Sequence, residues 1–423
     1  MRDPDGPPTA GASPAGASPG APPFGYAFLR EALAAADAAG VVHVGDDADP
    51  TLRYLAGETD ERTVAFVFDG ARAVCCPPAG DDVAVDPAFP GEVRTANAAK
   101  PPGVRAARAL ADLLGREPTA AVVAEDRGTV LVPAHLPHDA ALFLERAGFA
   151  LESTRAIERA RTAKTPAEVA AVERVQRAAA HGLARARALL ADATVADGVV
   201  VRDGDPVTVE ALRRGVDAAL AAGRVAPADG TAIAVGPGTG GDDVPAGAAD
   251  ESPGLRAGDP VVVGVSPRGR TGYRGALART LVVDATGGWE RRAHVACRAA
   301  LRAGLSAAEP GAPARRVREE VLAELAAHGF DPGAGGAVHG AVGHGIGLAR
   351  RERPALDADD ALEAGSTLAV APTLAAGEGV VRLETVGVVA EGGAEALVEH
   401  ALSMDPTVGR ESPDADGDPT GPS

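Results

Sequence analysis

The sequence predicts a two-domain protein, with an α/β domain over residues 25–155 and an α+β domain over residues 156–402. The chain has 423 residues and is 46% hydrophobic, which is enough to fill two cores. In the first part strand-like runs alternate with helical runs, and in the second part long helices surround groups of strands. Residues 1–24 and 403–423 are rich in Pro and Gly, so we expect both to be disordered tails.

The first domain is expected to open with a helix at FLREALAAADAAG, which Gly40 would end. A strand follows at VVHVG, residues 41–45. The stretch TVAFVFDGARAVCCPP predicts two strands around a turn at Asp69-Gly70. A second helix is expected at PGVRAARALADLLG and a further strand at AAVVAED, residues 120–126.

The second domain is expected to open with a long helix, because Thr165-Pro166 places Pro at a first helical position. Its apolar residues recur at helical spacing, and His181 is expected there as a solvated or packed side chain. The remaining predicted elements are the helix VTVEALRRGVDAALAAG, the strands TAIAVGPG, DPVVVGVSP and ARTLVVDAT, the helices RRAHVACRAALRAGL and ARRVREEVLAELAAHGF, and the strands STLAVAP and GVVRLETVGVVA.

The charge pattern excludes several classes of partner. The net charge is −18, and Lys100 and Lys164 are the only lysines. Nucleic acids and anionic membranes need a basic face, so we expect neither as a partner. An acidic surface suits a protein adapted to high salt, although a GC-rich genome would favour the same composition. No run of about 18 apolar residues and no signal peptide is present, so we expect a cytoplasmic protein.

The three cysteines, Cys75, Cys76 and Cys297, lack the spacing of a metal site. Adjacent cysteines rarely bridge each other. We therefore expect reduced, structural thiols, as is usual in the cytoplasm.

Three stretches of the second domain carry a resemblance through their order and spacing. They are GDPVVVGVSPRGRTGYRGALARTLVV, VHGAVGHGIGLARRERPAL and STLAVAPTLAAGEGVVRLETVGVV. They resemble the pita-bread metallopeptidases, the family of methionine aminopeptidase, aminopeptidase P, prolidase and creatinase. The stretch TLRYLAGETDERTVAFVFDGARAVCCPP resembles the smaller domain that precedes the catalytic domain of prolidases. The resemblance covers residues 26–402 and implies a pita-bread domain preceded by a creatinase-N-like domain.

In active members of that family, two Asp, one His and two Glu hold two divalent cations, and a water between the cations attacks a peptide carbonyl. The resemblance places His344 and Glu384 at the His and the second Glu. It places Gly264, Ala276 and Ala371 at the two Asp and the first Glu. One His and one carboxylate fall short of the three or four ligands of a tight site. We therefore expect no metal cofactor; an active protein would need two Mn, Co or Zn ions.

Two further histidines that orient substrate in the family are replaced as well. Arg351 stands seven residues after His344, and no His lies near Pro245. Asp242 and Asp243 could replace a lost ligand, but their Gly-rich surroundings favour a solvated loop. His339 lies five residues before His344, one residue further than the resemblance implies. No catalytic residues are therefore expected.

Local sequence patterns predict which groups lie next to His344 and Glu384. Strand alternation places Arg382 on the same face as Glu384, so Arg382 is the predicted neighbour of that carboxylate. His344 is expected to be a neutral residue bonded to Glu384 or to a backbone carbonyl, or else to contact a ligand in a remodelled pocket.

Three functions remain open from the sequence. The first is a pseudopeptidase that binds a peptide, a small molecule or a protein. The second is a working Xaa-Pro aminopeptidase or dipeptidase with a remodelled metal site. The third is a regulatory subunit, either as a homodimer or paired with an active paralogue.

Overall fold

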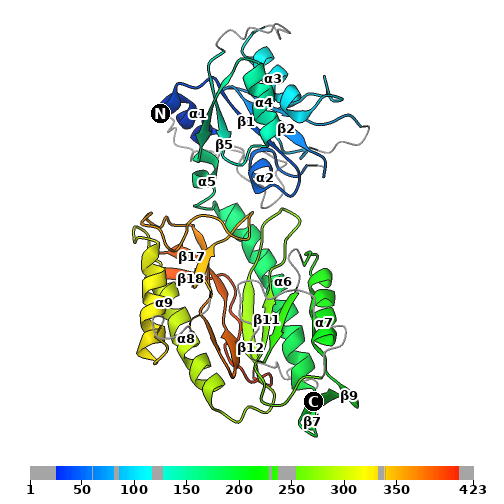
Figure 1. Ribbon diagram of the computed structural model, residues 1–423, viewed down its shortest axis with the longest axis vertical. Helices are drawn as coiled ribbons and strands as arrows, with labels where there is room; N and C mark the ends of the chain where they lie inside the picture. Colours follow the sequence, from blue (N-terminus) through cyan, green and yellow to red (C-terminus); the bar gives the residue numbers. More distant parts are fainter. Residues whose placement is uncertain are drawn as a thin grey trace, which may run out of the picture. The chain divides into compact units, whose positions relative to one another are not determined.

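The computed structural model describes residues 25–59, 61–80, 85–116, 127–227, 231–236, 254–331, 338 and 340–408. The chain divides into two compact units, residues 1–155 and residues 156–423 (Figure 1). Among the described helices, none is both long and apolar enough to span a membrane.

Unit 1 is built on a mixed six-stranded sheet in the order β4-β3-β2-β1-β5-β6. Neighbours β1, β2 and β3 are antiparallel, whereas β1–β5, β5–β6 and β3–β4 are parallel. The predicted hairpin at Asp69-Gly70 is confirmed, because the Asp69 carboxylate accepts hydrogen bonds from the backbone N–H groups of Ala71 and Arg72. The strands are β1 (Gly40–Gly45), β2 (Val64–Phe68), β3 (Ala73–Cys76), β4 (Glu92–Val93), β5 (Thr129–Pro133) and β6 (Ala150–Thr154).

Among the described residues of unit 1, four helices accompany this sheet: α1 (Ala27–Ala36), α2 (Pro50–Ala56), α3 (Pro102–Leu113) and α4 (His138–Arg146). Helix α3 and the strands share a core of Val, Leu and Ala side chains around Leu110. The predicted strand over residues 120–126 lies outside the described residues. Strands β5 and β6 and helix α4 were not predicted.

The predicted role of Gly40 is wrong. Helix α1 ends at Ala36, and Asp37 caps it in the left-handed conformation with φ 47°. Gly40 instead begins β1, where a Cβ would lie 2.7 Å from the Leu110 Cδ1 atom and 2.9 Å from the Phe68 carbonyl oxygen. Close packing of α3 on the sheet therefore requires glycine there.

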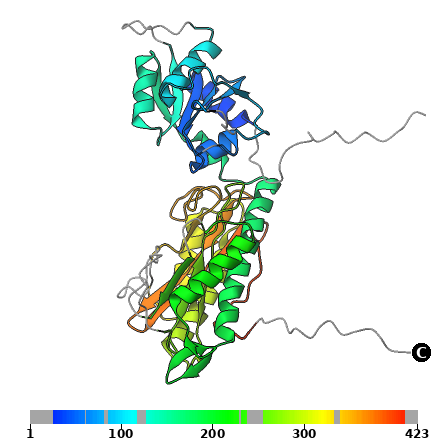
Figure 2. The same ribbon diagram turned by 90° about the vertical axis from the view of Figure 1, so that its right-hand side faces the viewer.

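The first half of unit 2 packs two long helices against three antiparallel strands. The predicted helix start at Thr165-Pro166 is confirmed: Thr165 and Glu168 form a reciprocal capping box, and Pro166 is the first helical residue. The apolar faces of both helices meet one face of the strands (Figures 1 and 2). These elements are α6 (Pro166–Ala191), α7 (Val209–Ala222), β10 (Thr231–Val235), β11 (Val261–Val265) and β12 (Leu277–Leu281).

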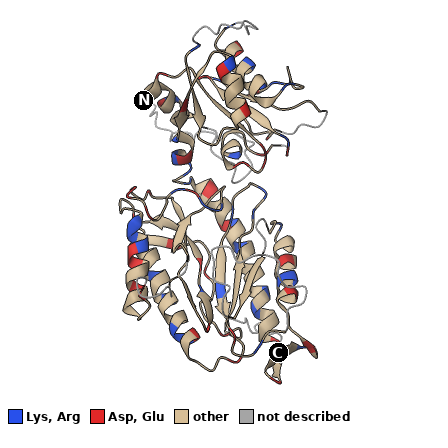
Figure 3. Cartoon of the chain, in the orientation of Figure 1, with Lys and Arg blue, Asp and Glu red and all other residues tan. Residues whose placement is uncertain are grey.

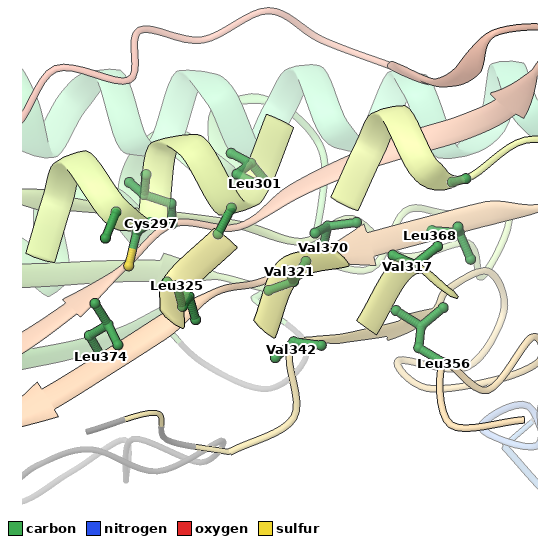
Figure 4. Packing of buried hydrophobic residues seen from close by; sticks show 14 of the residues in the cluster. Cys297, Leu301, Val317, Val321, Leu325, Val342, Leu356, Leu368, Val370 and Leu374 are labelled. Carbon is green, nitrogen blue, oxygen red and sulfur yellow. The ribbon is translucent and has the colours of Figure 1, made fainter. Parts of the chain in front are cut away.

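The second half of unit 2 repeats this arrangement with helices α8 (Trp289–Ala307) and α9 (Arg315–Ala327). Their shared core includes Cys297, Leu301 and Val321 (Figure 4). The strands are β13 (Gly343–Gly345), β14 (Thr367–Val370), β15 (Thr373–Ala376), β16 (Gly379–Arg382), β17 (Thr385–Ala390) and β18 (Gly393–Ala396). The predicted strand GVVRLETVGVVA is broken at Leu383-Glu384, because β16 pairs with β15 and β17 pairs with β14.

Smaller elements complete unit 2. They are helix α5 (Ala156–Ala160) and a three-stranded sheet of β7 (Thr194–Ala196), β8 (Val199–Arg202) and β9 (Asp205–Pro206). His181 lies exposed on α6, which is one of the two placements predicted for it. Helix α9 carries both Arg and Glu, which form ion pairs one turn apart such as Arg315–Glu319, so basic and acidic residues lie close together on it (Figure 3).

Residues 403–408 differ from the tail predicted for them. The Arg187 guanidinium on α6 donates hydrogen bonds to the carbonyl oxygens of Ser403 (2.8 Å), Asp405 (2.6 Å) and Val408 (3.1 Å). The N–H of Val282 donates to the carbonyl oxygen of Met404. Polar composition predicted a tail there, but a buried cation needs acceptors, and the backbone carbonyls of this segment supply them.

Candidate active-site cleft

Gly264 lies on β11 and faces away from the helices. Its neighbours Val263 and Val265 belong to the core under α6 and α7, whereas Val262 packs against Val380 of β16 on the opposite face. Gly264 shares that opposite face with Val262 because strand residues alternate. A Cβ placed on Gly264 would meet its nearest atoms at an ordinary 3.8 Å, so the backbone does not require glycine.

Ala276 and Ala371 are both buried next to strands that reach this region. Gln176 of α6 fixes the backbone of Ala276 from both sides: its Nε2 donates to the Ala276 carbonyl oxygen (2.8 Å), and its Oε1 accepts from the Ala276 N–H (3.0 Å). Ala371 follows β14, and its N–H donates to the Val342 carbonyl oxygen at 2.7 Å. Each position therefore offers a methyl group and no side-chain ligand atom.

His344 on β13 and Glu384 in the link between β16 and β17 are brought together. The His344 Nε2 atom lies 3.9 Å from Glu384 Oε1, and His344 Nδ1 lies 3.1 Å from its neighbour's carbonyl oxygen. The hydrogen bond expected for His344 is thus made with the backbone carbonyl of Gly345, whereas Glu384 lies nearby but beyond hydrogen-bond distance. The predicted pairing of Arg382 with Glu384 is confirmed, with Arg382 Nη2 donating to Glu384 Oε2 at 3.2 Å.

Burial and nearby charges determine the protonation states of His344 and Glu384. Burial lowers the pKa of His344, although the charge of Glu384 opposes the shift. Burial alone would raise the pKa of Glu384, but the charge of Arg382 and its hydrogen bond to the carboxylate outweigh it and hold the pKa below its usual range. The ring is therefore neutral and the carboxylate ionised near neutral pH.

The glycines around His344 permit close backbone approach. A side chain at Gly343 would collide with the Ala369 carbonyl oxygen of the neighbouring strand β14. A side chain at Gly347 would collide with the Glu352 carboxylate. Small residues are therefore required on both sides of His344 for this loop to pack.

Glu352 forms a buried ion cluster that the sequence analysis missed. Its carboxylate pairs with the Lys164 ammonium at 2.8 Å and with the Arg161 guanidinium, and it accepts from the Ala349 N–H at 3.1 Å. Charges of Lys164 and Arg161 overcome the burial that would raise its pKa, so the pKa of Glu352 lies below its usual range. The signal available in the sequence was Lys164 itself, one of two lysines in the chain.

A cavity of about 530 Å³ opens beside His344 within unit 2. Basic and acidic side chains both contribute to its wall. The charged lining residues are Arg161, Arg318, Arg351, Arg353, Glu158, Glu352 and Asp357. Arg351, which the resemblance places at a family histidine, therefore faces the same cavity as His344.

Several predicted positions cannot be placed. Pro245, Asp242, Asp243 and His339 lie outside the described residues. Within the described part of the chain, the group of three ligand-type side chains close enough to share a metal ion is His43, Asp49 and His135, in unit 1. It includes neither His344 nor Glu384.

The sequence model of metallopeptidase family M24 matches residues 169–391, more than half of the chain. This chain belongs to metallopeptidase family M24. The match runs from within α6 to the end of β17, so it contains the five positions Gly264, Ala276, His344, Ala371 and Glu384.

Solved structures of this family share the fold over nearly the whole chain. X-Pro aminopeptidase from Thermotoga maritima MSB8 covers 89% of this chain and 98% of its own, with a TM-score of 0.71 and 14% identity. Prolidase from Pyrococcus horikoshii OT3 covers 88% and 97%, with a TM-score of 0.69 and 17% identity. The predicted pita-bread fold with a preceding smaller domain is confirmed.

A curated relative matches in sequence over a shorter region. Methionine aminopeptidase from Treponema pallidum (strain Nichols) is 35% identical over 114 residues. That match spans 25% of this M24 chain and 43% of the relative.

Proposed function

We propose that this M24 chain is a pseudopeptidase, a binding protein that keeps the peptidase frame without its dinuclear metal centre. The carrying observation is the cleft itself, where Gly264, Ala276 and Ala371 offer no ligand atoms. The structure brings His344 and Glu384 together, and among the described residues at the five ligand positions these are the two side chains that could hold an ion.

The charge balance supports the same proposal. Two divalent ions held about 3.5–4 Å apart need bridging carboxylates to offset their repulsion. Glu384 is the single carboxylate among the five positions, and Arg382 already neutralises it. The residues present therefore do not fit a dinuclear centre, and no hydrolytic step follows from them.

The cavity beside His344 supports a binding role. Its volume of about 530 Å³ lies within the usual range of small-molecule pockets. Four arginines and three carboxylates contribute to its wall. A short peptide or small molecule that carries a carboxylate suits this wall, because guanidinium groups bind carboxylates through paired hydrogen bonds.

Peptidase activity is the direct test. The full chain is incubated with Mn²⁺, Co²⁺ or Zn²⁺ and Xaa-Pro dipeptides or longer Xaa-Pro peptides, and release of the N-terminal residue is measured. We expect no release above that of the folded variant Glu384→Gln. Turnover by the natural chain that this variant abolishes would establish the remodelled-site peptidase and overturn the proposal.

Binding is tested separately with the dipeptide Ala-Pro by calorimetry. We expect the variant Arg351→Glu to bind more weakly than the natural chain, because it places a carboxylate in the cavity wall. His181→Ala, an exposed change on α6, is the matched control and should leave binding unchanged. Equal affinities of Arg351→Glu and the natural chain would show that the cavity is not the binding site.

A further inference from the structure

Unit 1 contains a cluster of ligand-type side chains that plays no part in the cleft of unit 2. His43 lies on β1, Asp49 caps the start of α2, and His135 lies in the turn after β5. Strands β1 and β5 are parallel neighbours, so the loops that follow them meet at the same edge of the sheet. This edge, beyond the carboxyl ends of parallel strands, is where α/β sheets bind ligands.

The three side chains converge on the Asp49 carboxylate. Its Oδ2 lies 2.7 Å from His43 Nε2, and its Oδ1 lies 3.8 Å from His135 Nε2. All the ligand atoms lie within 4.8 Å of one another. In a tetrahedral zinc site with bonds of about 2.0–2.2 Å, the ligand atoms lie about 3.3–3.6 Å apart, so the cluster needs only small side-chain movements to enclose an ion.

Two members are held rigidly and the third can adjust. His43 is fully buried, and a side chain at Gly45 would collide with the Asp49 carboxylate, so glycine lets this carboxylate reach back over β1. His135 is 47% exposed, and its ring faces that of His43 edge-on with 5.1 Å between centroids. An exposed ring can turn toward an ion and leaves an open coordination position for water.

The chemistry of the group matches a particular kind of cation. Two imidazole nitrogens and one carboxylate oxygen suit zinc and its neighbours in the first transition row better than magnesium or calcium. The Thr51 N–H donates a hydrogen bond to Asp49 Oδ1 at 2.7 Å, which helps to hold this carboxylate in place beside the two rings. Among the described residues, the buried His43 Nδ1 finds no hydrogen-bond partner, so Nε2 makes the polar contact of this ring.

We propose that His43, Asp49 and His135 bind a divalent transition-metal ion of the zinc class, with water completing the coordination. This site is separate from the cleft around His344 and does not depend on the function proposed for that cleft. Three protein ligands with one open position is an arrangement that lets a bound ion hold an exchangeable water or an anion.

The test uses the full chain without an affinity tag. Zn²⁺ binding is measured by calorimetry, and Co²⁺ binding by the intense visible absorption of a four-coordinate ion. The three cysteines are buried, so their thiols do not compete for the probe. We expect one tightly bound ion per chain. A chain that binds no Zn²⁺, or a Co²⁺ spectrum without the four-coordinate bands, would overturn the proposal.

Variants then locate the ion. His135→Ala should weaken Zn²⁺ binding by about 100-fold or more, because removing even an outer partner of a metal ligand costs about 10–100-fold. Asp49→Asn should do the same and still cap α2, since Asn is also a good capping residue. His138→Ala changes an exposed histidine three residues from His135 and should bind as the natural chain does.

One further variant separates this site from the cleft of unit 2. His344→Ala should leave the Zn²⁺ affinity unchanged. Loss of binding in His344→Ala, or equal affinities of His135→Ala and the natural chain, would place the ion elsewhere and overturn the proposal.

Discussion

Glu352 illustrates how one side chain can join distant segments of the chain. Its carboxylate sits between Lys164 and Arg161, which precede α6, while Glu352 itself follows the glycine-rich loop around His344. All three side chains are buried. Removing one member of a buried ion cluster leaves the others uncompensated in a medium where isolated charge is costly.

Glu352→Gln should therefore lower the free energy of unfolding by about 3–5 kcal/mol at neutral pH. Urea denaturation followed by circular dichroism measures this. Glu319→Gln, which breaks the exposed Arg315–Glu319 pair, is the matched control and should cost no more than about 1 kcal/mol. Equal losses of unfolding free energy in the two variants would show that the buried cluster stabilises the fold no more than an exposed ion pair does.

The same residue predicts a pH dependence of stability. Because the pKa of Glu352 is lowered in the folded state, its contribution is complete above the ordinary value of about 4.3 and is lost as pH falls through the folded pKa. The natural chain should therefore lose more stability than Glu352→Gln on acidification from neutral pH to below about pH 4. Urea midpoints at both pH values give the comparison, and parallel losses would contradict it.

The cleft permits a gain of metal binding by substitution. Gly264→Asp, Ala276→Asp and Ala371→Glu together place three carboxylates near Glu384, where their mutual repulsion should destabilise the metal-free variant. Mn²⁺ should restore stability, by about 2.7 kcal/mol at 100 times the dissociation constant. Thermal unfolding with and without Mn²⁺ tests this, and a stabilisation equal to that of the natural chain would refute it.

At the scale of elements, the start of α6 depends on interactions within four residues. The Thr165 hydroxyl accepts from the Glu168 N–H, and the Glu168 carboxylate accepts from the Thr165 N–H at 2.9 Å. Glu168 also accepts from the Tyr273 hydroxyl at 2.6 Å, which ties the helix start to the segment before β12. The cap thus has both a local and a tertiary component.

Thr165→Ala should cost about 1 kcal/mol of unfolding free energy, the usual loss for a helix cap. Thr286→Ala, in an exposed loop, is the control and should fall within about 0.5 kcal/mol of the natural chain. Chemical denaturation of both variants measures the difference. A cost for Thr165→Ala no larger than that of the control would exclude the cap as a stabilising element.

The segment after residue 402 behaves as part of the folded domain because Arg187 binds it. Ending the chain after Leu402 removes three carbonyl acceptors from this buried guanidinium, and we expect a loss of about 2–3 kcal/mol. A chain ended after Val408 keeps these acceptors and should match the full chain. Thermal unfolding of the two truncated chains decides the matter, and equal stability would contradict the role of Arg187.

At the scale of the whole molecule, each unit has hydrophobic cores of its own. We propose that residues 1–155 and residues 156–423 fold as separate domains. Trp289, the single tryptophan, lies in α8, so its fluorescence reports on the second unit, whereas circular dichroism reports on both.

The fragment of residues 156–423 should therefore unfold cooperatively in urea by tryptophan fluorescence, as the full chain does by the same signal. The fragment of residues 1–155 should show its own transition by circular dichroism. A fragment without a cooperative transition would show that one unit needs the other to fold.

The sequence by itself determined the features that arise from neighbouring residues. The Thr165-Pro166 helix start, the hairpin at Asp69-Gly70 and the pairing of Arg382 with Glu384 each depend on residues a few positions apart. Steric limits and local hydrogen bonds act at that range, so composition and spacing reveal them. The order of motifs around His344 also sufficed to indicate the M24 fold.

Only the tertiary structure decided which contacts are made between segments that are distant in the sequence. It assigned Gly40 to the packing of α3, broke the strand at Leu383-Glu384 between two sheets, and gave residues 403–408 a partner in Arg187. It also gathered Glu352 with Lys164, and His43 with Asp49 and His135. Most of these contacts join segments that lie far apart along the chain. The contact between His43 and Asp49 is shorter in range, but it depends on the path of the loop between them. Their free energy comes from burial and charge pairing, which depend on surroundings that exist only once the chain has folded.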